Sequence, residues 1–339
     1  MAEPAEAVAH PRDARMLEGI EAPAAAFATA AARGRLHHAW LLTGPEGVGK
    51  ASFAYRAARW LMGARPDPAL GPLGTAADDP VARMIASQSH PDLLVLERSP
   101  DKKAIPVDEA RRLPEFFSKA PAMSPWRVAI IDAADDLNLN AANAVLKTLE
   151  EPPPRGVVLL VSHSPGRLLA TIRSRCRRLA FRPWDAARLT GFVEARLGLD
   201  GEAARRLAYL AKGAPGRALQ LAAADALALD AAAGALLARL PQADEAGLVA
   251  LADGFRGGEG AARFALLMER LADRVHEAAL ADGLAGDRDT RGLDAWARAW
   301  RRLDTLPGEV EALNLDRADA FWSALAELRH AARARPFRI

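Results

Sequence analysis

The segment AWLLTGPEGVGKASFAYRAARWLM, residues 39–62, constrains the fold more than any other part of the chain. A short apolar run (39–44) leads into a glycine-rich loop, and a segment with helical periodicity (51–62) follows at once. Gly44, Gly49 and Lys50 fit the pattern G-x-x-x-x-G-K, whose backbone amides curl around phosphate oxygens when it joins a strand to a helix. The segment therefore predicts a strand, a phosphate-binding type of loop and a helix.

Strand-like and helix-like segments alternate through the first half of the chain. Nearly continuous apolar runs, which suit strands buried on both faces of a parallel sheet, occupy residues 39–44, 91–97, 126–134, 157–164 and 177–183. Helical patterns lie between them, at 51–62, 107–117 and 140–151. This alternation predicts a doubly wound α/β domain over residues 1–183, with the proline- and glycine-rich stretch 63–90 as an excursion from it.

The strand signals stop after Pro183. Short amphipathic helices ending at glycine predict a small helical domain over 184–224, and helical patterns continue over 225–339 as a larger helical domain. Apolar residues recur at helical spacing in this last part, and we expect core packing rather than base stacking from Phe264, Leu267, Met268, Leu271, Val275, Trp296, Trp300 and Leu303.

Composition excludes several classes of protein. The chain has 339 residues, 45 basic and 43 acidic, so its formal charge of +2 neither demands nor excludes a nucleic-acid partner. No apolar run approaches the roughly 20 residues of a membrane span, and the opening residues lack the apolar core of a signal peptide. Cys176 is the only cysteine, which rules out an internal disulfide and a cysteine-built zinc site. We expect a soluble cytoplasmic protein with no membrane partner.

The phosphate-binding pattern is incomplete at the position after its lysine. A serine or threonine there would bind Mg²⁺ through its hydroxyl, but this chain has Ala51, and Ser52 lies about 100° further round the helix. The candidate nucleotide-binding residues are Gly44, Gly47, Gly49, Lys50 and Ala51. Two interpretations stay open, a loop retained for its shape and a loop that binds ATP or ADP weakly.

The acidic side of the site is also incomplete. Asp132 ends the apolar run VAIID, where it could hold a metal, but Ala133 occupies the position at which an ATPase of this type carries a water-polarising glutamate. Asp135 and Asp136 follow two residues later. Because phosphoryl transfer depends on positioning and charge stabilisation, the two losses together predict no hydrolysis by the chain itself.

A cluster of arginines surrounds the cysteine in LLATIRSRCRRLAF, residues 168–181. Arg175, between Ser174 and Cys176, lies at the end of the predicted α/β domain, where it could meet a neighbouring subunit. The planar guanidinium fork matches phosphate oxygens, so Arg175 is a candidate arginine finger, a side chain that completes the nucleotide site of another protein. The alternative interpretation is a solvated basic edge.

Four stretches, HHAWLLTGPEGVGK, NAVLKTLEEPP, RLLATIRSRC and GAPGRAL, resemble the delta-prime subunits of bacterial DNA polymerase III clamp loaders. The resemblance covers about residues 15 to 225 and is fainter in the last third, where NLDR (314–317) is suggestive. It implies an AAA+ module, a three-helix lid and a C-terminal collar that holds a five-subunit ring. It also implies that Arg175 acts on ATP of a neighbouring gamma/tau subunit and that Arg217 is a sensor-like arginine.

The resemblance further implies gamma/tau and delta subunits as partners, with the sliding clamp and primer-template DNA engaged through the complex. Many relatives carry a four-cysteine zinc module, but residues 63–90 have no cysteine and His90 alone cannot hold zinc, so we expect neither zinc nor a required cofactor. Two rivals remain. One is an active ATPase that uses Ser52 or a water, and the other is a free-standing DNA-binding AAA+ protein whose Arg111 and Arg112 contact phosphates rather than solvent alone.

Overall fold

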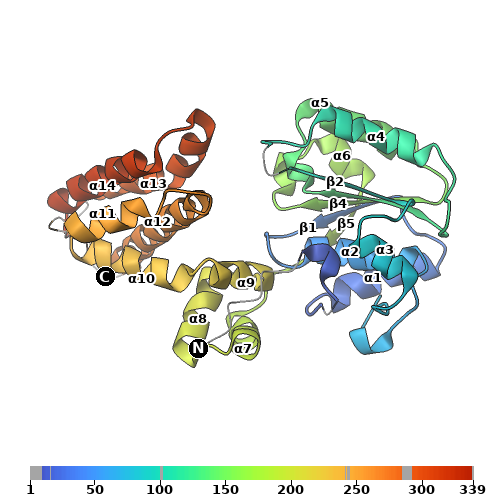
Figure 1. Ribbon diagram of the computed structural model, residues 1–339, viewed down its shortest axis with the longest axis horizontal. Coiled ribbons are helices and arrows are strands. Elements are labelled where there is room, and N and C mark those ends of the chain that lie inside the picture. The colour runs from blue at the N-terminus through green and yellow to red at the C-terminus, as the bar shows by residue number, and fades with distance from the viewer. Residues whose placement is uncertain are drawn as a thin grey trace. The chain divides into compact units, whose positions relative to one another are not determined.

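The computed structural model describes residues 10–15, 17–99, 102–240, 242, 245–284 and 292–337. The chain divides into two compact units, Met1–Gln220 and Leu221–Ile339, which are drawn in Figure 1. Most of the opening residues, which are predicted to lack the apolar core of a signal peptide, lie outside the described residues. The three-domain division at residues 183 and 224 stays a prediction.

A five-stranded parallel sheet forms the centre of the first unit, with the strand order β2-β3-β4-β1-β5. The strands are β1 (Ala39–Thr43), β2 (Leu93–Glu97), β3 (Arg127–Asp132), β4 (Gly156–Ser162) and β5 (Arg177–Ala180). Each coincides with one of the apolar runs of the sequence, although β4 begins one residue before its run, and β1 and β4 are buried along their whole length. The predicted parallel α/β fold is confirmed, and its strand order, with the phosphate loop after β1, is that of an AAA+ module.

Helices cover both faces of the sheet, as Figure 1 shows. One face carries α1 (Glu21–Ala32), α2 (Lys50–Leu61) and α3 (Pro80–Ala86). The other carries α4 (Val107–Phe117), α5 (Leu139–Glu150) and α6 (Ala170–Arg175). Because successive strand residues point to opposite faces, Trp40 and Leu42 of β1 belong to the first layer and Leu41 to the second.

Two buried arginines of α2 attach the stretch 63–90 and the segment before α1 to the domain. Arg56 and Arg59 are 1% and 2% exposed. The Arg56 guanidinium donates to the carbonyl oxygens of Pro72 (2.8 Å), Arg15 (2.9 Å) and Leu70, and Arg59 donates to two carbonyls of the segment before α1. Since a buried cation must be hydrogen-bonded, these bonds fix both segments against α2.

Replacement of Arg56 by methionine tests this attachment. The substitution keeps most of the side-chain volume but leaves three carbonyl oxygens without their donor, so we expect the free energy of unfolding to fall by about 2–4 kcal/mol. Urea denaturation measures the change, with the exposed Arg83→Met as a control that stays within about 0.5 kcal/mol of wild type. An unchanged stability in Arg56→Met would mean that the excursion is held by other contacts.

The first unit ends with helices α7 (Ala186–Leu197) and α8 (Gly201–Leu210) and with most of α9 (Pro215–Ala223). Aspartates cap the first two: the Asp185 side chain accepts from the Arg188 amide (2.8 Å) and Asp200 accepts from the Ala203 amide (2.8 Å). The predicted helices in this part of the chain are therefore confirmed.

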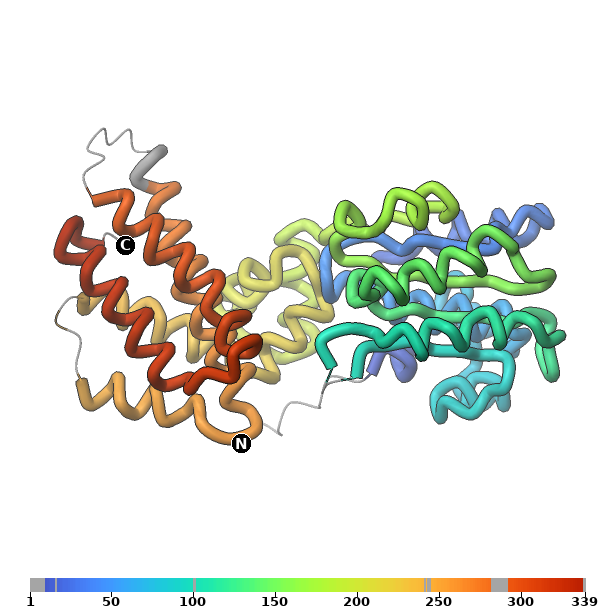
Figure 2. Tube along the Cα trace, turned by 90° about the horizontal axis from the view of Figure 1, so that it is seen from above, coloured from blue at the N-terminus to red at the C-terminus, as the bar shows by residue number. Residues whose placement is uncertain are grey.

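The second unit is helical throughout its described residues. Its helices are α10 (Ala226–Ala238), α11 (Glu245–Asp253), α12 (Gly260–Leu284), α13 (Leu293–Leu313) and α14 (Arg317–Ala334). The last three of these helices run alongside one another in Figure 2. The apolar positions predicted for its core are buried, with one exception. Trp300 is 38% exposed, so core packing was the wrong prediction there; its ring lies 6.1 Å from that of His276.

Among the residues that the structure describes, no single helix has both the length and the apolar composition of a membrane span. The pair α9 and α10, bent by 74°, meets the two criteria together, on length and composition alone.

Candidate functional site

The phosphate loop, residues 44–50, leaves the end of β1 and enters α2. Gly44, Gly47 and Gly49 have φ angles of +149°, +77° and +95°. These conformations favour glycine, and at Gly44 a side chain has no room either, since a Cβ would lie 2.3 Å from the Phe181 carbonyl oxygen. The loop thus has the backbone shape that the motif predicts.

Lys50 is turned into its own loop. The side chain is only 2% exposed, and Nζ donates to the carbonyl oxygens of Gly44 (2.7 Å) and Pro45 (2.5 Å). Burial lowers the pKa of Lys50 to about 8, against an opposing effect of the nearby Asp132 carboxylate. The ammonium that would meet a phosphate is therefore already bonded to the protein.

The first turn of α9 packs directly on the same loop. The Gly216 amide donates to the Gly47 carbonyl oxygen at 2.8 Å. A Cβ on Gly47 would lie 2.5 Å from the backbone nitrogen of Arg217, and one on Gly216 would lie 2.8 Å from the Gly47 oxygen. The fold therefore brings Arg217 to the phosphate loop, as expected for a residue of that site, and both glycines are needed for this close approach.

The acidic residues near the loop are mostly committed to structural bonds. Asp135 accepts from the Ser162 hydroxyl (3.0 Å) and from the backbone amides of His163 (2.6 Å) and Ser164 (3.1 Å). Asp136 pairs with Arg98 at 3.2 Å. Neither carboxylate replaces the water-polarising acid that is missing at Ala133. Within the described ranges, no group of three or more His, Cys, Asp or Glu side chains is arranged to hold a metal ion.

Asp132, at the end of β3, has a strongly altered acidity. Burial raises its pKa to about 6, the Glu97 carboxylate adds to the rise, and Lys50 opposes it. A carboxyl group whose pKa is higher in the folded than in the unfolded chain destabilises the fold once it ionises. This cost develops between about pH 4 and pH 6 and persists at neutral pH.

Asp132→Asn should therefore stabilise the protein above pH 6. The substitution removes the ionisation, so we expect the gain in unfolding free energy to be about 1–2 kcal/mol larger at pH 8 than at pH 4.5. Urea denaturation of both proteins at the two pH values measures it, with the exposed Asp78→Asn as the control. A variant that is less stable than wild type at pH 8 would show that the Asp132 carboxylate is a net stabilising partner of Lys50.

Arg175 is the last residue of α6 and lies beside the end of α5. Its Nη2 is 3.0 Å from Oε1 of Glu150, and its Nη1 donates to the Thr171 carbonyl oxygen at 3.1 Å. The Arg175 side chain is 36% exposed and that of Glu150 is 50% exposed. Glu150 was not predicted as a site residue from the sequence, although it belongs to the stretch LKTLEEPP.

The neighbours of Arg175 have different environments. Ser174 is exposed, and its hydroxyl donates to the Thr171 carbonyl oxygen at 3.1 Å. Cys176 packs against the core beneath the second helical layer, and burial raises the pKa of its thiol to about 12. Because the thiolate is the reactive form, Cys176 acts as a packing residue at this position.

Arg111 and Arg112 lie on α4 and are exposed. Arg111 pairs with Asp108 at 3.0 Å and Arg112 with Glu109 at 2.5 Å, each within one turn of the same helix. Exposed pairs of this kind contribute only about 0–1 kcal/mol and break readily. A DNA contact by these arginines stays a prediction.

Residues 20–185 match a family model described as "DNA polymerase III, delta subunit". Residues 20–185 belong to this family. Across 179 residues the chain is 39% identical to DNA polymerase III subunit delta' of Pseudomonas aeruginosa, covering 52% of this chain and 53% of the relative. Across 188 residues it is 30% identical to the subunit delta' of Escherichia coli, covering 56% and 55%.

The delta-prime resemblance inferred from the sequence is thus confirmed over the α/β part of the chain. The chain spans about half the length of these relatives. A solved structure of a DNA polymerase III gamma subunit-related protein from Thermotoga maritima is 19% identical, with a TM-score of 0.46, and the match covers 87% of this chain and 95% of that one.

Proposed function

We propose that this chain is a clamp-loader subunit of DNA polymerase III that does not hydrolyse ATP and that presents Arg175 to ATP bound by a neighbouring gamma/tau subunit. The phosphate loop carries the first half of the proposal. Lys50 is bonded to two loop carbonyls, α9 is hydrogen-bonded to Gly47, and Ala51 has no oxygen for Mg²⁺. ATP would have to displace Lys50 and α9, and it would then lack a metal-binding hydroxyl and a water-polarising acid.

Arg175 carries the second half. Its guanidinium is partly exposed at the end of α6, and its partners among the described residues are an exposed glutamate and one carbonyl oxygen. Both contacts cost little to exchange for phosphate oxygens, which an arginine fork binds more strongly. A neighbour's γ-phosphate would gain the charge stabilisation that phosphoryl transfer requires.

The partners in this proposal are gamma/tau and delta subunits in a cytoplasmic replisome, with the sliding clamp and primer-template DNA bound by the assembled complex. Size-exclusion chromatography with gamma/tau and delta subunits distinguishes it from a free-standing DNA-binding protein. Co-elution with both supports the proposal, and a chain that elutes alone while binding DNA supports the rival.

The absence of turnover is a direct expectation of the proposal. Purified chain with Mg²⁺-ATP should release no phosphate above background, and Ala51→Thr alone should not restore release, because the acid at position 133 is still missing. A coupled phosphate-release assay measures both proteins, with Lys50→Ala as the matched control. Hydrolysis by wild type that disappears in Lys50→Ala would establish the rival ATPase.

A further inference from the structure

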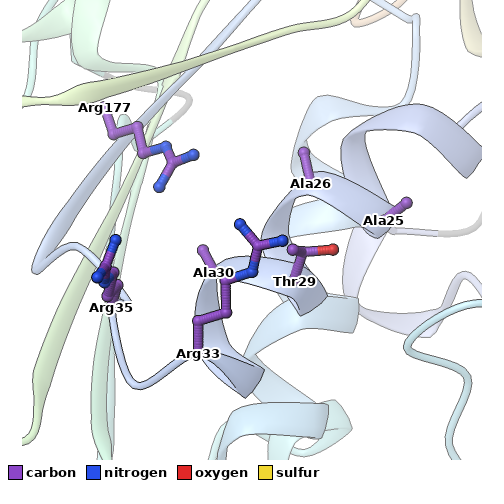
Figure 3. A pocket seen from close by; sticks show the side chains of 7 residues that line it. All are labelled: Ala25, Ala26, Thr29, Ala30, Arg33, Arg35 and Arg177. Carbon is purple, nitrogen blue, oxygen red and sulfur yellow. The ribbon is translucent and has the colours of Figure 1, made fainter.

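An open pocket of about 390 Å³ lies between α1 and the start of β5, and it contains three arginines. Arg33 ends α1, Arg35 lies in the loop before β1, and Arg177 begins β5. All three line the pocket, and Figure 3 shows the side chains of Arg33 and Arg177 extending toward the space between them. The phosphate loop contributes none of the residues that line this pocket.

Backbone hydrogen bonds fix the main chain at Arg33 and Arg35, and a buried aromatic ring contacts Arg177. The Gly34 amide donates to the Ala31 carbonyl oxygen (3.0 Å) and the Arg35 amide to that of Ala30 (3.0 Å), and Gly34 has φ of +64°. This glycine turn ends α1 with an arginine on each side of it. The Arg177 guanidinium lies 4.9 Å from the ring centroid of the buried Trp40, a cation–π contact that orients it.

The three positive charges have no acidic partner among the residues that the structure describes. None of the three guanidinium groups makes a hydrogen bond or an ion pair with those residues, and no carboxylate lines the pocket. Some exposed arginines of the unit are paired with acids, as Arg65 is with Asp78, Arg98 with Asp136, Arg111 with Asp108 and Arg112 with Glu109, whereas the pocket brings three arginines together with no acid among its lining residues. Like charges that share one pocket repel, so an anion bound there would gain from all three.

We infer that this pocket binds consecutive phosphate groups. The arginine fork matches phosphate oxygens bidentately, and the side chains of Ala25, Ala26 and Ala30 leave the pocket wide enough for more than one phosphate. A single carboxylate supplies one negative charge against three positive ones, whereas a polyphosphate or a nucleic-acid backbone supplies several. The inference does not depend on the clamp-loader assignment.

Titration of the full chain with tripolyphosphate and with a 20-nucleotide single-stranded DNA tests the inference. Arg33→Gln/Arg35→Gln/Arg177→Gln should weaken binding about tenfold or more. Arg83→Gln/Arg196→Gln/Arg205→Gln changes the net charge equally at exposed sites elsewhere and should stay within about twofold of wild type. The double variant Arg33→Gln/Arg35→Gln retains Arg177 and its contact with Trp40. Weaker binding by this variant therefore cannot come from a fold disturbed by the loss of that contact.

The two probes distinguish the source of the phosphate. If the triple variant loses binding of both probes, and tripolyphosphate competes with DNA for the wild-type chain, the ligand is a nucleic-acid backbone. If the triple variant loses binding of tripolyphosphate alone, the ligand is a free polyphosphate. If the triple variant binds both probes like wild type, the inference is wrong. Titration with polyglutamate is a third measurement. If the triple variant loses binding of polyglutamate alone, the inference is also wrong, because the pocket would then fit an acidic protein surface.

Discussion

A chain that ends at Ala224 should stay folded and fail to join the clamp-loader complex. The first compact unit ends at Gln220 and has its own cores on both faces of the sheet, so the truncation removes none of them. The removed helices have a separate core that includes Phe264, Leu267 and Phe321. In the proposed function these helices form the collar that holds the ring together.

Co-purification with gamma/tau and delta subunits measures the effect of this truncation. We expect stoichiometric recovery of the full chain and recovery of the truncated chain at background level, with circular dichroism and a cooperative thermal transition showing that residues 1–224 are folded. Stoichiometric recovery of the truncated chain would contradict the collar assignment.

Arg175→Ala should leave the protein folded and assembled but impair clamp loading. The Arg175–Glu150 pair is exposed and contributes about 0–1 kcal/mol, so the thermal transition should hardly move. Removal of an arginine finger costs about 10³–10⁵ in turnover at the site it serves. Since this chain would serve one of several ATP sites, bulk ATP turnover should fall modestly while clamp loading falls about tenfold or more. Arg175→Lys should rescue little, because an ammonium lacks the planar fork.

Three variants isolate the effect of Arg175. Arg173→Ala and Arg178→Ala remove nearby positive charge, and we expect loading close to that of wild type. Glu150→Gln removes the ion pair but keeps the arginine, and it should also load clamps within about twofold of wild type. Equal damage from Arg173→Ala or Arg178→Ala would assign the effect to a general basic edge, and wild-type loading by Arg175→Ala would remove the finger from the account.

The sheet was predictable because its central strands β1, β3 and β4 are buried on both faces. Strands of that kind appear in the sequence as continuous apolar runs, and the glycine pattern at residues 44–50 marks the loop that follows β1. Trp300 shows the limit of periodicity, since its helical spacing with Trp296 and Leu303 predicted burial, whereas the residue is 38% exposed.

Contacts between distant segments were not predictable. The stretch 63–90 looked like an excursion because of its prolines and glycines, yet Arg56 binds it through backbone carbonyls, which carry no sequence signal. The hydrogen bond from Gly216 to Gly47 likewise joins the first turn of α9 to the phosphate loop, far apart in the chain. The motif identified Lys50, but only the fold shows that its ammonium is bonded to the loop itself.

The central claim is that this chain acts on the ATP of a neighbour and not on ATP of its own. The most direct measurement is DNA- and clamp-stimulated ATP turnover, together with clamp loading, by complexes assembled from gamma/tau, delta and either Lys50→Ala or Arg175→Ala. We predict wild-type turnover and loading with Lys50→Ala, and reduced turnover with a larger loss of loading with Arg175→Ala. The reverse pattern, in which Lys50→Ala loses activity and Arg175→Ala keeps it, would contradict the account.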